Sequence, residues 1–184
     1  MNVSNALKVL FEHKFSISTE KIFLKDSIGR TLSKPLTVSK SIPEFDTSSM
    51  DGFAIKKSSL GKIKRFKILG EIPAGSKSGY VIRPYECVRV YTGSRMPKNA
   101  DFVVLQENTS IENDFMRVVT VDKKSPYVRK KGLDFNRGQV INHPMIIDFK
   151  LISALASLNL EKVSVIKKPK VCIIPTGNEV LALG

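Results

Sequence analysis

The sequence predicts an α+β protein of several domains, with a central part made almost entirely of β-strands. Between residues 50 and 122, short apolar runs alternate with turn signals, a pattern typical of a small barrel or sandwich. Apolar residues at helical spacing occur outside this region, in two stretches near residues 4–14 and 149–158. At the end of the chain a strand leads through a loop into the start of a helix, as in a Rossmann-like α/β domain.

The N-terminal segment predicts an amphipathic helix over residues 4–14. Val3, Leu7 and Leu10 fall on one helical face, and Asn2 or Ser4 can cap the N-terminus. Residues 20–24 are expected to form a linker or a helical turn, and residues 30–40 an extended strand. A polar loop punctuated by proline then covers residues 42–49.

The central region is predicted as β because its apolar runs are short and separated by turn residues such as those at 73–75 and 112–114. Many short strands joined by loops favour a barrel or sandwich over a sheet built from βαβ units. The expected strands are Gly52–Ile55, Phe66–Ile72, Tyr80–Ile82, Cys87–Tyr91, Phe102–Leu105 and Met116–Val121.

The pattern changes after residue 134. Residues 139–141 predict a short strand, and Asp148 is a suitable N-cap for a helix over residues 149–158 that ends at Asn159. Val163–Ile166 and Val171–Ile174 are predicted strands, and the second leads into the loop and helix start at residues 175–180. Because one strand cannot build an α/β domain, we expect the rest of that domain to lie beyond Gly184.

Composition restricts the function. The chain has 30 Lys and Arg against 17 Asp and Glu, a net charge of +13, which favours anionic partners. Basic residues cluster at 62–67, 123–131 and 162–170, but no nucleic-acid-binding motif accompanies them, so we expect a solvated basic surface. With two Cys, both in apolar runs and expected to be buried, and two His, a zinc site is not expected. Neither a secretory signal nor a membrane-spanning run is present, which predicts a cytoplasmic protein.

Four segments together resemble the MoeA/gephyrin E-domain family, in the order and spacing of that family and over nearly the whole chain. The first combines a loop with a Met-Asp-Gly turn, the second a Thr-Gly turn with an Ala-Asp strand, and the last two are Gly-containing loops. They are residues 43–55 (PEFDTSSMDGFAI), residues 90–97 (VYTGSRMP) with 100–104 (ADFVV), residues 129–134 (RKKGLD) and residues 175–180 (PTGNEV).

The resemblance implies a molybdopterin molybdenumtransferase, an enzyme that inserts molybdenum from molybdate into molybdopterin-AMP and releases AMP with the help of Mg²⁺. It implies a homodimer in which a mobile β lid faces the α/β domain of the partner subunit. The β-rich lid domain would cover residues 46–137, inserted in an elongated linker domain of residues 25–45 and 138–168. Residues 1–24 would form a helix that packs on the later α/β domain, which begins at residues 169–184.

By the same resemblance, the catalytic residues would be Asp51, Thr92, Asp134 and Glu179, and the three carboxylates among them would bind Mg²⁺, which prefers such oxygens. The residues that would bind molybdopterin-AMP or molybdate are Thr92, Gly93, Arg129, Thr176 and Gly177. The Thr92 hydroxyl and the Gly93 N–H would suit an anion. Asn178 and Leu133 stand where the family carries acidic residues, and Lys130 and Lys131 replace arginines.

Other interpretations remain open at this point. Asp51-Gly52 is a common turn dipeptide, Thr92-Gly93 can be a simple turn, and Asp134 can pair with Arg129 or Arg137 as a surface ion pair. We expect the isolated 184-residue chain to be inactive. The alternative function is a non-enzymatic dimeric scaffold of the gephyrin E-domain type, and a basic barrel that binds nucleic acid ranks third. No nucleic-acid or membrane partner is expected.

Overall fold

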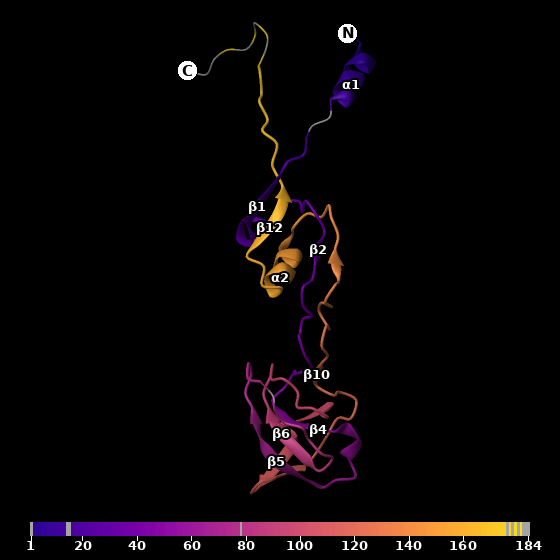
Figure 1. The fold of residues 1–184 in the computed structure, drawn as a ribbon, viewed down its shortest axis with the longest axis vertical. Coiled ribbons are helices and arrows are strands. Elements are labelled where there is room, and N and C mark those ends of the chain that lie inside the picture. The colour runs from indigo at the N-terminus through magenta and orange to yellow at the C-terminus, as the bar shows by residue number, and fades with distance from the viewer. Residues whose placement is uncertain are drawn as a thin grey trace. The chain divides into compact units, whose positions relative to one another are not determined.

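The computed structural model describes residues 2–13, 16–77, 79–175, 177, 179 and 181 (Figure 1). The chain divides into two compact units, one of Thr37–Ile141 and one of Met1–Leu36 together with Asn142–Gly184. The mainly-β character expected of the central region is confirmed. Among the described helices, none has the length and apolar content needed to cross a membrane.

A curled six-stranded sheet forms the centre of the Thr37–Ile141 unit. Its strands are β4 (Gly52–Ile55), β5 (Arg65–Ile72), β6 (Glu86–Val90), β7 (Phe102–Leu105), β8 (Thr109–Glu112) and β9 (Phe115–Val118). Their order is β7-β4-β6-β5-β9-β8, with β5 and β6 parallel and the other neighbours antiparallel. Strand β8 was not predicted, and the expected strand at residues 80–82 is reduced to one bridge between Val81 and Lys98.

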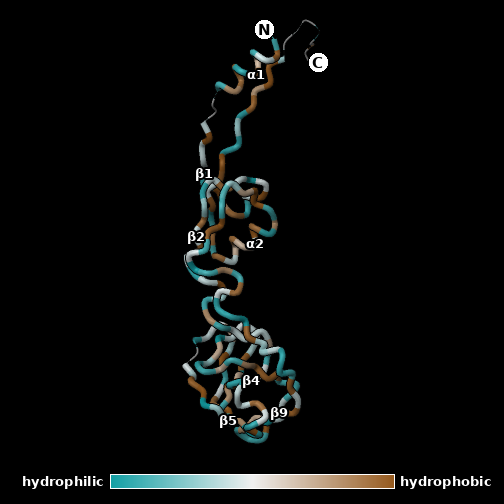
Figure 2. The backbone as a smooth tube through the Cα atoms, turned by 90° about the vertical axis from the view of Figure 1, so that its right-hand side faces the viewer, coloured by the Kyte–Doolittle hydropathy of each residue, from teal (hydrophilic) through white to brown (hydrophobic). Residues whose placement is uncertain are grey.

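Both faces of this sheet carry a buried core, because successive side chains of a strand point to opposite faces. Figure 2 shows hydrophobic and hydrophilic residues interleaved along this part of the chain. One cluster contains Phe53, Ile55, Phe66, Cys87, Phe102, Val104 and Met116. The other contains Ala54, Ile72, Ile82, Val88, Val90, Met96 and Val103. The expected burial of Cys87 is confirmed.

Short elements surround the sheet. Strand β3 (Thr47–Ser48) pairs antiparallel with β10 (Val128–Arg129). Two 3-10 helices, η2 (Lys57–Ser59) and η3 (Gln106–Asn108), follow β4 and β7, respectively. The two-residue strands β2 (Leu36–Thr37) and β11 (Val140–Ile141) stand at the boundaries between the units in sequence.

The second unit is built on an antiparallel pair of β1 (Thr19–Phe23) and β12 (Lys162–Ile166). Helix α2 (Phe149–Ser157) contacts the 3-10 helix η1 (Leu24–Asp26). The expected cap of α2 is confirmed, since the Asp148 carboxylate accepts from the N–H of Leu151 at 2.7 Å, and Asn159 is left-handed as expected, with φ 58°. Leu32, Ile147, Leu155, Val163 and Val165 form the buried interior of this unit.

Helix α1 (Val3–Glu12) confirms the N-terminal helix, and of the two candidate caps Asn2 is the one used, accepting from the Asn5 N–H at 2.9 Å. All residues of α1 are at least partly exposed.

Three sequence expectations are wrong. Residues 19–23 form strand β1 rather than a linker or turn, because their partner β12 lies about 140 residues later and leaves no local signal. Residues 30–40 form only isolated bridges and β2. Residues 171–174 are not a strand, because no described segment pairs with them, and Cys172 among them is exposed rather than buried.

Candidate functional site

Three of the four motif segments meet within the Thr37–Ile141 unit. Strands β3 and β10 place Thr47 opposite Arg129, which joins the first segment to the third. The second segment attaches to the same strand on its other side: the Ser48 N–H donates to the Ser94 carbonyl at 2.9 Å, and the Gly93 N–H to the Ser48 carbonyl at 2.8 Å. Segments far apart in sequence thus form one continuous hydrogen-bonded surface.

Asp51 and Thr92, both predicted site residues, are in direct contact. Oδ1 of Asp51 accepts from the Thr92 N–H at 2.8 Å and from the Thr92 hydroxyl at 2.9 Å. The Thr92 backbone N–H is the largest cause that lowers the pKa of Asp51, followed by its hydroxyl, with a further contribution from the charge of Arg89. Asp51 is therefore held as a partly exposed carboxylate with a fixed orientation.

The turn at residues 91–94 explains why glycine follows Thr92. Gly93 has φ 87°, a left-handed conformation that favours glycine, and the Ser94 N–H closes the turn on the Tyr91 carbonyl at 2.8 Å. The donors of Thr92 are used by Asp51, and the Gly93 N–H is used by Ser48. The expected anion contact of Thr92 and Gly93 stays a prediction, and in this structure the turn serves to hold Asp51.

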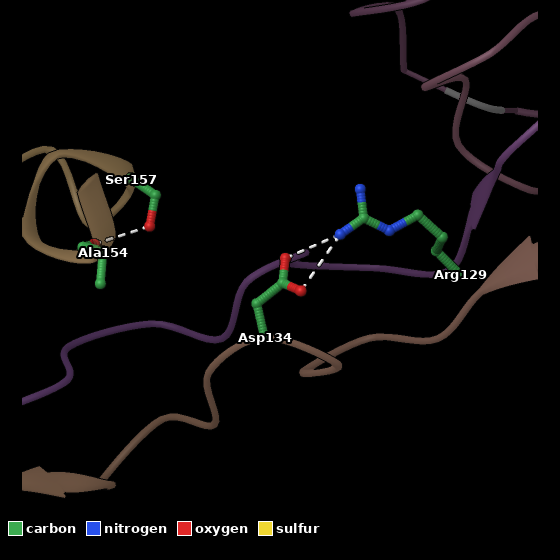
Figure 3. A network of polar contacts seen from close by, with 4 residues as sticks. All are labelled: Arg129, Asp134, Ala154 and Ser157. Carbon is green, nitrogen blue, oxygen red and sulfur yellow. Dashed lines mark hydrogen bonds and ion pairs between the residues drawn. The ribbon is translucent and has the colours of Figure 1, made fainter. Parts of the chain in front are cut away.

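Asp134 lies at the other end of the paired segments, where its N–H donates to the Ile42 carbonyl at 2.9 Å. Figure 3 shows the guanidinium of Arg129 reaching both carboxylate oxygens of Asp134, with Nη2 at 3.1 and 2.8 Å from them. Of the two ion pairs open to Asp134 from the sequence, the one with Arg129 is formed. The Asp134 charge is thus already compensated.

Asp46, which lies in the first motif segment, is a further charged residue of this surface. Its carboxylate accepts from Nζ of Lys130 and from the N–H of Lys131, both at 2.8 Å, and its carbonyl accepts from the Met96 N–H at 2.9 Å. Partial burial raises the pKa of Asp46, but the hydrogen bonds and charge of Lys130 and the Lys131 N–H outweigh it, so that the pKa is lowered. Asp46 therefore joins the three motif segments.

A cavity of about 490 Å³ opens beside this surface. Phe45 and Arg95 form one wall, with the guanidinium 4.6 Å from the ring centroid, a cation–π contact. Asp46 and Lys98 also line the cavity. It contains groups that can contact a ligand with both planar and anionic parts.

The fourth motif belongs to the other unit. Gly177 has φ 124°, and a side chain there would overlap the carboxylate of Glu179, which is exposed. Thr176 and Asn178 lie outside the described residues. Within the described part of the chain, no three His, Cys, Asp or Glu side chains are close enough to hold a metal ion, so the predicted magnesium ligands Asp51, Asp134 and Glu179 stay a prediction.

Comparisons with known proteins agree with the motifs. A family described as the MoeA N-terminal region (domain I and II) matches residues 1–159. A molybdopterin molybdenumtransferase from a Nostoc species is 31% identical over 171 residues, and one from Staphylococcus aureus is 31% identical over 186. The crystal structure of a molybdopterin biosynthesis MoeA protein from Pyrococcus horikoshii is similar with a TM-score of 0.79 at 26% identity, over 98% of this chain.

The matches extend over only part of these relatives. The aligned region covers 39% of the Nostoc protein and 44% of the S. aureus protein, and 50% of the P. horikoshii chain. A second P. horikoshii MoeA structure matches with a TM-score of 0.74 at 28% identity, over 88% of this chain and 45% of its own. The chain therefore spans half or less of the length of each of these proteins.

Proposed function

Since this chain belongs to the MoeA N-terminal family, we propose that it is the N-terminal portion of a molybdopterin molybdenumtransferase. The proposed reaction is the insertion of molybdenum from molybdate into molybdopterin-AMP, with release of AMP and assistance from Mg²⁺. The observation that supports it most is the contact of Asp51 with Thr92, because it orients an ionised carboxylate where two of the family motifs meet.

The residues of this chain fit the proposed magnesium chemistry unequally. Asp51 fits, because it is partly exposed and its lowered pKa keeps it ionised, and carboxylate oxygens are ligands that Mg²⁺ prefers. Asp134 fits less well, since both of its oxygens are in contact with Arg129, and it would have to exchange that partner. Bound Mg²⁺ would neutralise charge on the phosphoanhydride of the substrate.

Arg95 forms no ion pair with a described carboxylate and would supply positive charge to an anionic substrate near this surface. Arg129 and Lys130 would add their charges if they exchanged Asp134 and Asp46 for the substrate. Thr92 would act chiefly by orienting Asp51. The four-part domain division with a β lid, the homodimer, the cytoplasmic location and the inactivity of the isolated chain belong to this same proposal. They rest on the family resemblance.

The test is complementation of a bacterial strain that lacks its own molybdopterin molybdenumtransferase. The gene, continued past codon 184, is expected to restore a molybdenum-dependent reductase activity, and the 184-residue chain alone is not. Asp51→Asn in the longer protein is expected to lower the restored activity at least about tenfold, by loss of one charge at the reacting phosphates.

Asp122→Asn is the matched control, because Asp122 is another carboxylate with a lowered pKa, held by a backbone N–H of Lys124 and the hydroxyl of Ser125. It is expected to retain activity. Equal activity of the two variants would contradict the role proposed for Asp51. Activity of the 184-residue chain alone would contradict the proposed inactivity of the isolated chain.

A further inference from the structure

A second cavity, of about 310 Å³, lies in the Thr37–Ile141 unit between the turn after η2 and the end of β9. We propose that this cavity binds a small organic anion, a phosphate or carboxylate attached to an apolar group. The inference goes beyond the proposed transferase activity and does not depend on it.

The cavity is separate from the candidate functional site, because the two lie on opposite faces of the six-stranded sheet. Leu60, Ile63, Val118 and Val121 line the cavity, and all four pack on the core cluster that includes Phe66. The cavity of the candidate site lies on the other side, where its lining residue Met96 belongs to the second cluster and Tyr80 packs on that cluster.

Three cations line the cavity: Lys64, Arg117 and Lys123. None of the three forms an ion pair with a described carboxylate, and no acidic residue is among the described residues that line the cavity. A concave surface lined by charges of one sign concentrates the potential and attracts counter-ions. Because Arg117 alternates along β9 with Met116 and Val118, which face the cavity side, its guanidinium points to the other face of the sheet. An anion would therefore gain from Lys64 and Lys123.

The ammonium group of Lys123 lies near the segment that carries Lys64. A Cβ built on Gly61, three residues before Lys64, would lie 3.8 Å from Nζ of Lys123.

The cations come from two basic segments that are remote in sequence. Residues 56–70 contain six Lys and Arg and no acidic residue, and Lys123 begins another of the basic clusters. The fold brings part of each basic cluster to one cavity. Lysines scattered at random over a surface would not be expected to gather in this way.

The lining favours a small ligand over a nucleic acid. Single-stranded nucleic acids bind on aromatic side chains that stack with bases, and the described lining contains none. The four aliphatic side chains instead form an apolar surface next to the charges. The volume is at the lower end of small-molecule sites, about 300–1,000 Å³, which suits one ring or a short alkyl chain bearing one anionic group.

The experiment is calorimetric titration of the purified 184-residue protein with phenyl phosphate at low salt, and with inorganic phosphate and benzyl alcohol as partial probes. We expect phenyl phosphate to bind at least threefold more tightly than inorganic phosphate and benzyl alcohol not to bind detectably. Raising the salt should weaken the binding, since ionic screening reduces the attraction of exposed charges.

The variant Lys64→Gln/Lys123→Gln is expected to weaken phenyl phosphate binding at least tenfold. Lys67→Gln removes a neighbouring exposed charge that does not line the cavity, and it should change binding less than twofold. Equal effects of the two variants, or no binding of phenyl phosphate, would overturn the proposal. Binding of a single-stranded oligonucleotide without phenyl phosphate binding would also overturn it and identify a nucleic-acid surface.

Discussion

Thr92 donates both its backbone N–H and its hydroxyl to the same oxygen of Asp51, at 2.8 and 2.9 Å. The two residues are 41 positions apart in the sequence, and each belongs to a different family motif. Because the hydrogen bonds favour the ionised carboxylate, they lower the pKa of Asp51. Thr92 lies in a turn, and through this contact it also favours the ionised form of Asp51.

Thr92→Val removes the hydroxyl donor and keeps the backbone one, so the pKa of Asp51 should rise part of the way toward its ordinary value. Thr92→Ser keeps both donors and should leave the pKa low. The measurement is a pH titration of the Asp51 carboxyl carbon by NMR. An unchanged pKa in Thr92→Val would show that the hydroxyl contributes nothing.

The same shift predicts how stability depends on pH. The folded-state pKa of Asp51 lies below its unfolded value of about 3.9. The contribution of ionised Asp51 to the free energy of unfolding is therefore fully present above pH about 3.9. It is lost as the pH falls through the lower folded-state pKa. In Thr92→Val this acid-dependent loss should be smaller, which denaturant unfolding between pH 5 and pH 2 would show.

Asp46 should matter more for stability than other exposed carboxylates. Asp46→Asn removes the charge that holds Lys130 and the Lys131 N–H, and the expected loss in unfolding free energy is about 1 kcal/mol at pH 7. Glu44→Gln breaks the nearby exposed pair with Lys40 and should cost less than about 0.5 kcal/mol. Urea unfolding measures both.

Acid provides an internal check on Asp46. Because its folded-state pKa is lowered, the stabilisation should disappear as the pH falls through that value, and wild type and Asp46→Asn should then converge. A difference that persists at pH 2 would mean that the substitution acts by packing rather than by charge.

Gly52 cannot accept a side chain, although its conformation is ordinary. A Cβ there would lie 2.1 Å from the Val104 carbonyl oxygen of the neighbouring strand β7, and backbone cannot move away as a flexible side chain can. Gly52→Ala should therefore destabilise the protein by about 3 kcal/mol or more. Gly79→Ala, where a Cβ would meet nothing within 4 Å, should change thermal stability little. Equal melting temperatures of the two variants would contradict this account.

Two buried serines should respond oppositely to alanine. The Ser59 hydroxyl is buried without a described partner, so Ser59→Ala should leave stability unchanged or raise it, because no hydrogen bond is lost. The Ser94 hydroxyl donates to the Ile72 carbonyl at 2.6 Å and accepts from the Tyr91 N–H at 3.0 Å. Ser94→Ala should cost about 2 kcal/mol. A destabilised Ser59→Ala in thermal unfolding would indicate a partner for that hydroxyl.

The sequence predicted elements whose signals are local. Helix α2 was found with its cap at Asp148 and its end at Asn159, and β4 and β7 were found with their bounds. Pairings between distant segments were missed, because neither β1 with β12 nor β3 with β10 has a local pattern that names its partner.

The candidate site shows the same division. The motifs identified Asp51 and Thr92 as residues, but only the fold shows that they touch, and only the fold gives Asp46 a role. The ion pair of Asp134 with Arg129 was one of two alternatives that the sequence left open. Residue identity came from the motifs, and the partners came from the three-dimensional arrangement.

The structure places the two cysteines in opposite environments, and this predicts different reactivities for their thiols. Cys87 is buried in the sheet core, and burial raises the pKa of its thiol to about 12; Cys172 is exposed. Since the thiolate is the reactive form, one thiol per chain should react rapidly with Ellman's reagent at pH 8. The second should react only after unfolding in guanidinium.

Cys172→Ser should remove the fast reaction, and Cys87→Ser should leave it unchanged. Two fast thiols would mean that the core around Phe66 and Met116 opens readily to reagent. No fast thiol would mean that residues 171–174 are covered in solution, for example by a second copy of the chain, and dilution during the assay would then restore the reaction of Cys172.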